Sequence, residues 1–343
     1  MNIGILTCGG DCPGLNAAIR AVTRRSISTY GYNVLGIKNG WIGLVEGDVQ
    51  PLTLESISGI LIKGGTILGT SRRNPLKHKE DLEEIKENIK KFDLQALIAI
   101  GGDEALSVAY HLSEIGYSVI GIPATIDNDI FGTDRTFGFD TAITIVTEAV
   151  DRLHTTAESH HRVMVVEVMG RNTGWIAATG GMAGGADLIL IPEVPFSIKK
   201  ICDLIRARGE RGKTFSIVVV AEGAKSMEQK EPVTTTDKLD EFGHVILGGI
   251  GDVLGHEIEA NTDLETRVAR LGHIQRGGTP TAYDRVLATR FGIEAADLVH
   301  QKEFGCMVGL HGTQIVPVPL KDVLAGPKNV DKRLYEIATV FFG

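Results

Sequence analysis

Short runs of apolar residues recur along this chain, and each ends in glycine or in a polar side chain. The runs cover residues 3–7, 96–100, 118–122, 163–168, 217–221 and 267–272. Most of them place Ile, Val or Leu in succession, without the alternation of apolar and polar positions that a half-exposed strand shows. Unbroken runs of this length are typical of strands buried on both faces of a parallel sheet.

Longer segments between these runs carry apolar residues at helical spacing. Over about 80–91, one face is marked by Leu82, Ile85 and Ile89. A second helix is expected after its N-cap residue Asp140, with an apolar face of Ala142, Val146, Ala149, Val150 and Leu153. Further helices are expected from about Leu15 and from near Ala105. The alternation predicts an α/β fold of mainly parallel sheets covered by helices.

Residues 225–243 interrupt the alternation. This segment contains Lys, Glu, Asp and three consecutive threonines, and it lacks an apolar run. A long surface loop or insertion is predicted there, with a lid as the alternative.

Composition narrows the class of protein. With 343 residues, 43% hydrophobic and 23% charged, the chain has the composition of a globular protein of two domains or one large α/β unit. A formal net charge of −8 argues against non-specific binding to nucleic acid or to an anionic membrane. Because no apolar run reaches the length of a membrane span and no basic leader precedes the first run, we expect a cytoplasmic protein.

Glycines and carboxylates follow three of the predicted strands. Gly9 and Gly10 end the first run, Gly101-Gly102-Asp103-Glu104 follow the second, and residues 125–129 (Thr-Ile-Asp-Asn-Asp) follow the third. Ligands of open α/β sheets bind at this carboxyl edge of the strands. Glycine loops that lead into helices bring backbone N–H groups close to phosphate oxygens. The spacing matches neither a P-loop nor a dinucleotide-binding loop.

Residues 125–129 also carry groups suited to catalysis. Asp127 and Asp129, together with the hydroxyl of Thr125, are able to deprotonate an alcohol and to hold Mg²⁺. An Asx-rich turn explains the same residues without any chemistry. From this segment alone both interpretations stay open.

Arginines accumulate near the predicted strand ends of this acidic chain. They are Arg162, Arg171, Arg267, Arg270 and Arg276, while Arg72 and Arg73 form a separate basic cluster with residues 77–79. A lone basic residue is usually solvated, whereas several at a ligand edge indicate a multiply charged small anion, such as a phosphate ester.

Taken in order, these segments resemble the phosphofructokinase family over almost the whole chain. The matching elements are residues 9–14, Gly64-Gly65-Thr66, Ser71-Arg72, Gly101-Gly102-Asp103, residues 125–129, Met169-Gly170-Arg171, Glu222 and residues 273–278. Each is weak alone, but all of them in this order are specific. Residues 225–243 and 340–343 are similar to the mixed-substrate branch, which contains ATP-using and pyrophosphate-using members.

The resemblance implies two similar α/β lobes, each with a mainly parallel sheet, and an active site between them. Residues 1–138 with about 275–325 would form the phosphoryl-donor lobe. Residues 139–274 with about 326–343 would form the fructose 6-phosphate lobe. The resemblance also implies a homodimer or homotetramer, in which Arg162 and Arg267 reach the sugar phosphate of the neighbouring subunit.

The implied reaction is the Mg²⁺-dependent phosphorylation of D-fructose 6-phosphate at its 1-hydroxyl, a step of glycolysis. By motif, Asp127 would be the base, Thr125 and Asp129 would organise the site, and Arg171 would stabilise charge during transfer. The positions matching donor contacts are Gly9, Gly10, Arg72, Arg73, Gly102, Asp103, Glu104 and Ala124, with Asp103 linked to the metal. The sugar-phosphate positions are Thr125, Asp127, Met169, Gly170, Arg171, Glu222, His273 and Arg276, with Arg162 and Arg267.

Two of these positions bear on the identity of the donor. ATP-using members typically have glycine at position 104, and a carboxylate there fills the space of the nucleotide's α-phosphate and repels it. Pyrophosphate users normally place lysine at position 124, and Ala124 lacks that charge. The steric and electrostatic block by the carboxylate at position 104 is harder to evade than the loss of one positive charge at position 124. Arg73 or Arg270 is able to replace that charge. Pyrophosphate is therefore predicted as the donor. The alternatives are ATP, a different sugar phosphate as acceptor, and a non-catalytic regulatory relative.

Overall fold

The computed structural model describes residues 1–228, 234–239 and 245–342 and divides the chain into two compact units. Unit 1 comprises Met1–Thr141 and Arg276–Pro327. Unit 2 comprises Ala142–Gln275 and Lys328–Gly343. The chain therefore leaves unit 1 after Thr141, returns at Arg276 and leaves again after Pro327. Which lobe binds the donor and which binds the sugar phosphate stays a prediction.

Unit 1 is built on an eight-stranded sheet of order β14-β13-β5-β4-β1-β2-β3, with β6 beside β5. Its strands are β1 (Asn2–Cys8), β2 (Asn33–Ile37), β3 (Val49–Leu52), β4 (Leu94–Gly101), β5 (Val119–Thr125), β6 (Phe137–Gly138), β13 (Cys306–His311) and β14 (Gln314–Pro319). The pairs β2–β3 and β13–β14 are antiparallel, and the remaining pairs are parallel.

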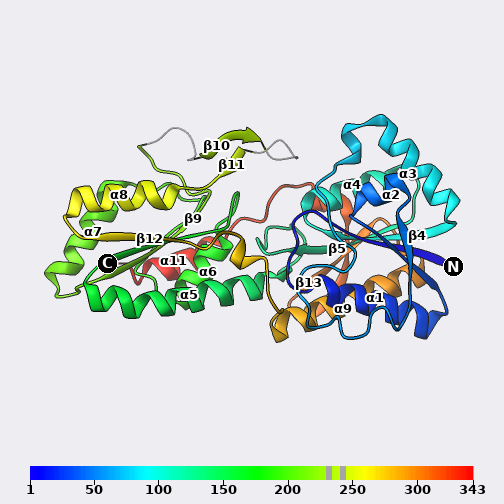
Figure 1. Ribbon diagram of the computed structural model, residues 1–343, viewed down its shortest axis with the longest axis horizontal. Helices are drawn as coiled ribbons and strands as arrows, with labels where there is room; N and C mark the ends of the chain where they lie inside the picture. Colours follow the sequence, from blue (N-terminus) through cyan, green and yellow to red (C-terminus); the bar gives the residue numbers. More distant parts are fainter. Residues whose placement is uncertain (229–233, 240–244, 343) are drawn as a thin grey trace. The chain divides into compact units, whose positions relative to one another are not determined.

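Helices cover both faces of this sheet (Figure 1). They are α1 (Leu15–Tyr30), α2 (Trp41–Glu46), α3 (Lys79–Lys91), α4 (Asp103–Glu114), α9 (Ala282–Gln301) and α10 (Leu320–Val323), with a 3₁₀ turn at Pro75–Lys77. Helices α1 and α9 lie together on one face, and α2, α3 and α4 lie on the other (Figure 1). Trp41, Leu44, Ile85 and Leu106 are fully buried between the second group and the sheet. Truncating one such side chain to Ala typically costs about 2–5 kcal/mol of stability.

Unit 2 contains a four-stranded parallel sheet of order β12-β7-β9-β8. Its strands are β7 (Val163–Val168), β8 (Leu188–Leu190), β9 (Ser216–Ala221) and β12 (Thr266–Arg270). The helices are α5 (Phe139–His160), which begins in unit 1, α6 (Trp175–Ala183), α7 (Ile198–Glu210), α8 (Ile250–Thr262) and α11 (Lys332–Thr339), with a 3₁₀ turn at Gly272–Gln275. None of the helices in the described parts of the two units is long and apolar enough to cross a membrane.

The structure confirms the predicted α/β class and the mainly parallel sheets, and it corrects two details. Helix α5 begins at Phe139, so Asp140 lies in its first turn and is not the N-cap. Its carboxylate instead accepts a hydrogen bond from the Thr281 hydroxyl at 2.7 Å. Residues 234–239 form β10, which pairs antiparallel with β11 (Val245–Leu247), so this part of the predicted loop or insertion contains a strand, and the lid stays a prediction. Residues 229–233 and 240–244 lie outside the described residues.

Candidate active site

Strand register brings the predicted donor and catalytic loops of unit 1 together. Cys8 of β1 pairs with Gly101 of β4, and Gly101 pairs with Pro123 of β5. The loops that follow these strands therefore leave the same edge of the sheet side by side. The order of the strands in the sheet reverses between β1 and β4. The strand that follows β1 in the chain, β2, lies on one side, and the strand that follows β4, β5, lies on the other. Such a switch point is where open α/β sheets bind ligands.

The loop after β1 depends on two glycines. Gly9 has φ +89°, a left-handed conformation that favours glycine, and its N–H donates to the Ser71 carbonyl at 3.0 Å. The Thr70 hydroxyl in turn donates to the Gly9 carbonyl at 2.7 Å. A Cβ on Gly10 would stand 2.6 Å from the guanidinium Nη1 of Arg276. The predicted donor loop is thus fixed against residues 70–71 and touches a predicted sugar-phosphate residue.

Two predicted donor residues lie in the first turn of α4. The helix begins at Asp103, with Gly102 as N-cap, slightly earlier than the start expected near Ala105. Acidic residues are stabilised at this position because they face the positive end of the helix dipole. Asp103 and Glu104 line a cavity of about 280 Å³ together with Asn74, Ser107 and Asp129. Three carboxylates thus border one concave space at the start of α4.

This cavity is suited to Mg²⁺ that arrives with phosphate oxygens. Proteins usually hold Mg²⁺ through one or two carboxylates, and the substrate's phosphates supply further ligands. Asp103 and Asp129 provide two carboxylates on the same cavity wall. Within residues 1–228, 234–239 and 245–342 there is no group of three or more His, Cys, Asp or Glu side chains that could hold a metal ion unaided. Asp103 and Asp129 are thus as many carboxylates as proteins usually contribute to Mg²⁺ when phosphate oxygens supply the other ligands, and they would hold the ion if it binds here.

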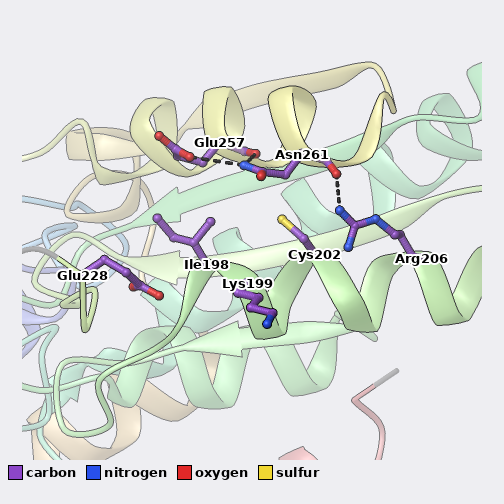
Figure 2. A pocket seen from close by; sticks show the side chains of 7 residues that line it. All are labelled: Ile198, Lys199, Cys202, Arg206, Glu228, Glu257 and Asn261. Carbon is purple, nitrogen blue, oxygen red and sulfur yellow. Dashed lines mark hydrogen bonds between the residues drawn. The ribbon is translucent and has the colours of Figure 1, made fainter.

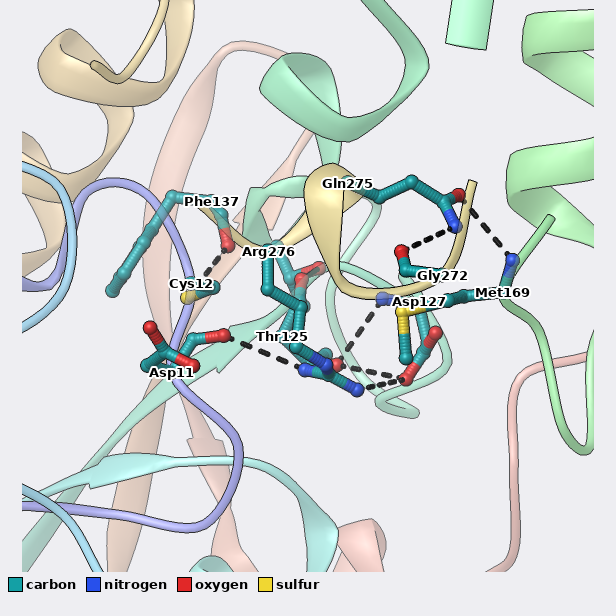
Figure 3. Close-up of polar contacts among 10 residues, drawn as sticks. Asp11, Cys12, Thr125, Asp127, Phe137, Met169, Gly272, Gln275 and Arg276 are labelled. Atoms are coloured by element: carbon teal, nitrogen blue, oxygen red, sulfur yellow. Dashed lines mark hydrogen bonds and ion pairs between the residues drawn. The ribbon is translucent and has the colours of Figure 1, made fainter. Parts of the chain in front are cut away.

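The predicted base is held at the end of β5, which extends through Thr125 (Figure 3). The Thr125 hydroxyl accepts from the Asp127 N–H at 3.1 Å and donates to Asp127 Oδ2 at 3.4 Å. Arg276 places Nη2 at 4.0 Å from the same Oδ2 and donates through Nη1 to the Asp11 carbonyl at 3.4 Å. The Asp127 side chain remains 25% exposed, so a substrate is able to reach it.

The loop that carries Asp127 is braced from behind. Asn128 is fully buried in a left-handed conformation (φ +52°), and its Oδ1 accepts from the Thr136 N–H at 3.0 Å. The Thr136 hydroxyl donates to the Thr125 carbonyl at 2.7 Å. Asn tolerates this backbone better than most residues, which explains why it stands between the two aspartates. The bracing reduces the conformational freedom that the base would otherwise lose on reacting.

A buried carboxylate on α9 supports the segment that follows this loop. Asp284 is fully buried, and its Oδ2 accepts from the Thr141 N–H at 2.8 Å and from the Thr141 hydroxyl at 2.6 Å. The Thr141 hydroxyl accepts from the Thr281 N–H at 3.0 Å, and Thr281 is the N-cap of α9. Burial raises the pKa of Asp284 to about 6, and the hydrogen bonds from Thr141 oppose the rise.

The raised pKa predicts a pH dependence of stability. The native state holds this proton more tightly than the unfolded chain, in which the pKa is near 3.8. The stabilisation by the proton is complete below that pKa and is lost as the pH rises through about 6, about 3 kcal/mol in total. Between about pH 5 and pH 7.5 we expect wild type to lose about 1.4 kcal/mol that Asp284→Asn does not lose. Urea unfolding at both pH values measures the free energy of unfolding of each protein. An equal change of that free energy with pH in wild type and Asp284→Asn would contradict the prediction.

The predicted sugar-phosphate residues of unit 2 gather at the carboxyl edge of its sheet. Met169, Gly170 and Arg171 follow β7, Glu222 follows β9, and His273 lies in the 3₁₀ turn after β12. The Glu222 N–H donates to the Val168 carbonyl at 2.8 Å, which joins two of these loops. A Cβ on Gly223 would stand 1.9 Å from the Arg171 carbonyl, so only glycine allows this approach.

Two predicted arginines lie at the opposite edge of the same sheet. Arg162 precedes β7, and Arg267 is the second residue of the neighbouring strand β12. Both are bound to Glu265, Arg162 through Nε at 2.7 Å and Arg267 through Nη2. The hydrogen bond from Arg162 lowers the pKa of Glu265. Within one chain, therefore, these arginines do not join Arg171 and Glu222, and a role at a neighbouring subunit's site stays a prediction.

The proposed substitutes for a donor-site lysine both have carboxylate partners. Arg73 binds Asp81 in the first turn of α3 through two hydrogen bonds, at 2.8 and 3.1 Å. Arg270 forms an ion pair with Asp252 of α8. Ala124 is 1% exposed in β5. These pairs show where the two arginines are held in this structure, and their contribution to donor binding stays a prediction.

Sequence reasoning missed several supporting residues. Gln275 is fully buried, its Oε1 accepts from the Met169 N–H at 3.3 Å, and its Nε2 donates to Gly272. It stands inside a matching motif, so the motif could have indicated it. Asp284 also had a local signal, because Thr281 followed three residues later by Asp284 is a capping-box pattern. Glu193, which accepts from the N–H groups of Gly174 and Val330, had none.

A second cavity lies in unit 2, away from all predicted site residues. It has a volume of about 360 Å³ between α7 and α8 (Figure 2). Its lining carries both signs of charge, from Lys199, Arg206, Glu228 and Glu257. Arg206 is paired with Asp203, and Glu228 accepts from the hydroxyls of Ser197 and Ser226. With this mixed and compensated charge the cavity indicates no particular class of ligand.

Comparison with known proteins agrees with this arrangement. The sequence model of the family described as Phosphofructokinase matches residues 2–299. The chain belongs to the phosphofructokinase family. A pyrophosphate–fructose 6-phosphate 1-phosphotransferase of Streptomyces coelicolor is 53% identical, and the alignment covers 100% of each chain. The ATP-dependent 6-phosphofructokinase 2 of the same organism is 50% identical over 99% of this chain and 100% of that protein.

Solved structures support the family fold. Pichia pastoris phosphofructokinase in the T-state is 33% identical, with a TM-score of 0.85. The alignment covers 99% of this chain but only 36% of the Pichia chain, which is far longer. The pyrophosphate-dependent phosphofructokinase of Nitrosospira multiformis is 22% identical, with a TM-score of 0.84, and covers 96% of this chain and 86% of its own. At that identity the likeness concerns the fold alone.

Proposed function

We propose that this phosphofructokinase-family protein transfers a phosphoryl group from pyrophosphate to the 1-hydroxyl of fructose 6-phosphate, forming fructose 1,6-bisphosphate and phosphate. The observation that carries the choice of donor is Glu104, a second carboxylate beside Asp103 on the wall of the donor cavity. Three relatives that are 53–54% identical along their whole length are named pyrophosphate–fructose 6-phosphate 1-phosphotransferase. These names support the acceptor as well as the donor.

In this proposal Asp127 Oδ2 accepts the proton of the 1-hydroxyl as the oxygen attacks the terminal phosphorus of the donor. The Thr125 hydroxyl and the braced loop hold that carboxylate in place. Phosphoryl transfer depends mainly on positioning and on neutralisation of charge. Arg171 would supply cationic charge to the transferring group, and Arg276 would bind the phosphate of the sugar. Mg²⁺, held by Asp103 and Asp129, would neutralise the donor's oxygens.

Glu104 disfavours a nucleotide in two ways. Its side chain lines the cavity together with Asp103 and takes up room there, and its charge would repel a further phosphate group. The volume of about 280 Å³ is also slightly below the usual range for pockets that bury small-molecule ligands, about 300–1,000 Å³. A pyrophosphate ion needs less room than ATP. ATP with the same acceptor remains the second candidate, because Ala124 lacks the lysine charge and a relative 50% identical is ATP-dependent.

The deciding experiment supplies purified protein with fructose 6-phosphate, Mg²⁺ and either pyrophosphate or ATP, and measures fructose 1,6-bisphosphate. We expect turnover with pyrophosphate and at least tenfold less with ATP, and the reverse ratio would reject pyrophosphate as donor. No product with either donor would reject the phosphofructokinase activity itself. Chelation of Mg²⁺ should abolish the reaction, since the ion would both position the donor and neutralise the charge of its oxygens.

The assembly and location follow as parts of the same proposal. Because Arg162 and Arg267 lie at the sheet edge opposite Arg171, we infer a homodimer or homotetramer in which they complete a neighbouring subunit's site. The Glu265 carboxylate between them would then compete with the sugar phosphate for their guanidinium groups. We also place the protein in the cytoplasm, where its sugar-phosphate substrate would be found.

A further inference from the structure

The buried carboxylate of Asp284 connects two segments of unit 1 that carry predicted catalytic side chains. Its Oδ2 accepts two hydrogen bonds from Thr141, at 2.8 and 2.6 Å. The Thr141 hydroxyl accepts the N–H of Thr281 at 3.0 Å, and the Thr281 hydroxyl donates to Asp140 at 2.7 Å. The first turn of α5 is therefore bound to the first turn of α9 through groups that are largely shielded from water.

Upstream, this network reaches the loop of the predicted base. Thr141 follows β6, whose Phe137 and Gly138 pair with Ala124 and Thr125 of β5. The preceding residue Thr136 holds both the Thr125 carbonyl and the Asn128 side chain, as described above. The path from Asp284 to Asp127 thus runs from Thr141 along the backbone to β6 and Thr136, and from there through hydrogen bonds to the loop of Asp127.

On the side of α9, the network reaches the arginine that faces this base. Thr281 stands five residues after Arg276, and the Arg285 guanidinium donates to the Pro280 carbonyl at 2.8 Å, which stiffens the connection. Arg276 Nη2 lies 4.0 Å from Asp127 Oδ2 (Figure 3). The two segments that Asp284 joins therefore meet again at the Asp127–Arg276 pair.

We propose that Asp284 is a positioning residue that acts through Thr141 and Thr281 to set the placement of Asp127 relative to Arg276. The roles of Asp127 and Arg276 in this proposal rest on the function proposed above. A displacement of about 1 Å at a reacting group lowers the rate by up to about 100-fold. Most of the predicted donor contacts, such as Gly9, Arg72 and Asp103, lie on other loops. The network reaches the donor side only at Ala124, at Asp129 and through the hydrogen bond from Arg276 to the Asp11 carbonyl, so donor binding should change less than sugar-phosphate binding.

The test compares Asp284→Ala, which removes the acceptor, with Asp284→Asn, which retains one acceptor oxygen of similar shape. For Asp284→Ala we expect kcat to fall at least tenfold and KM for fructose 6-phosphate to rise about fivefold, while KM for the donor stays within about twofold. Asp284→Asn should stay within about threefold of wild type throughout. Thr141→Val should reproduce the defect, and Thr141→Ser should restore near-normal constants.

Asp297→Ala is the matched control, because it removes a carboxylate on the same helix that binds Arg25 and Tyr30 instead. It should lower stability and leave all three constants unchanged. Wild-type constants in both Asp284→Ala and Thr141→Val would overturn the proposal. So would a parallel change of both KM values, which indicates general loosening of the fold.

Amide hydrogen exchange separates this proposal from the proposed function. Asp284→Ala should speed exchange at residues 125–136 and 276–281 and leave residues 69–72 as in wild type. This readout needs no activity, so it is interpretable even if wild type turns over neither donor. Unchanged exchange in both segments would reject the positioning role. Absence of turnover in wild type, with changed exchange in these segments, would reject only the assigned reaction.

Discussion

Replacement of Asp127 by Asn should lower kcat by about 100- to 10,000-fold, the usual contribution of a general base. The amide cannot take the proton of the 1-hydroxyl, although it keeps nearly the same size and the same backbone N–H bond to the Thr125 hydroxyl. KM for fructose 6-phosphate should change far less than kcat, because Asn still fills the position between Thr125 and Arg276. Steady-state kinetics with saturating donor measures both constants.

Asp134→Asn is the control for this loop. Asp134 lies seven residues further along the same connection, and its Oδ2 accepts from the Gly312 N–H at 2.7 Å. This variant should retain wild-type kcat, since its carboxylate supports the turn between β13 and β14. If Asp127→Asn kept more than about a tenth of wild-type kcat with an unchanged unfolding midpoint, Asp127 would not be the base.

Replacement of Glu104 by Gly should raise kcat/KM with ATP by roughly 10- to 100-fold, equivalent to about 1.4–3 kcal/mol. The change removes both the side-chain volume and the negative charge from the donor cavity. Gly in the first turn of α4 costs at most about 1 kcal/mol of stability, so the variant should fold. The ratio of ATP-dependent to pyrophosphate-dependent kcat/KM is the quantity to compare between variant and wild type.

Glu104→Gln separates charge from size, because it keeps the volume and removes only the charge. If repulsion dominates, Gln should give most of the gain with ATP, and if steric exclusion dominates, only Gly should. No gain with ATP in either variant would show that another feature of the donor cavity selects pyrophosphate. Leu324 and Pro327, which also border the cavity, would then be the next positions to change.

The sequence indicated the strands and the polar groups at their ends because those features are local. A run such as residues 118–122 predicts a buried strand from its own composition. In the structure this strand is β5, which begins at Val119 and continues to Thr125. The gathering of Gly9, Asp103 and Asp127 at one edge also followed, since parallel strands have a common carboxyl edge. The family and its fold are therefore confirmed, whereas the individual roles of these residues stay predictions.

What the sequence did not indicate depends on partners far apart in the chain. Asp140 is of a residue type that is common at the N-cap, but it binds Thr281, which lies 141 residues away. The partners of Arg73 and Arg270 were not foreseen either, because an ion pair needs a geometry that composition does not contain. Pairing of residues 234–239 with β11 was hidden for a related reason, since polar threonines gave no apolar alternation.

The contact between Gly10 and Arg276 has a consequence for how variants of this protein are interpreted. A methyl group at position 10 would enter the space of the guanidinium, with a separation of 2.6 Å from Nη1. Position 10 belongs to the predicted donor loop and Arg276 to the predicted sugar-phosphate set. A side chain at position 10 would therefore displace the Arg276 guanidinium, so a loss of affinity for the sugar phosphate in a Gly10 variant is explained by this displacement without a second substrate site.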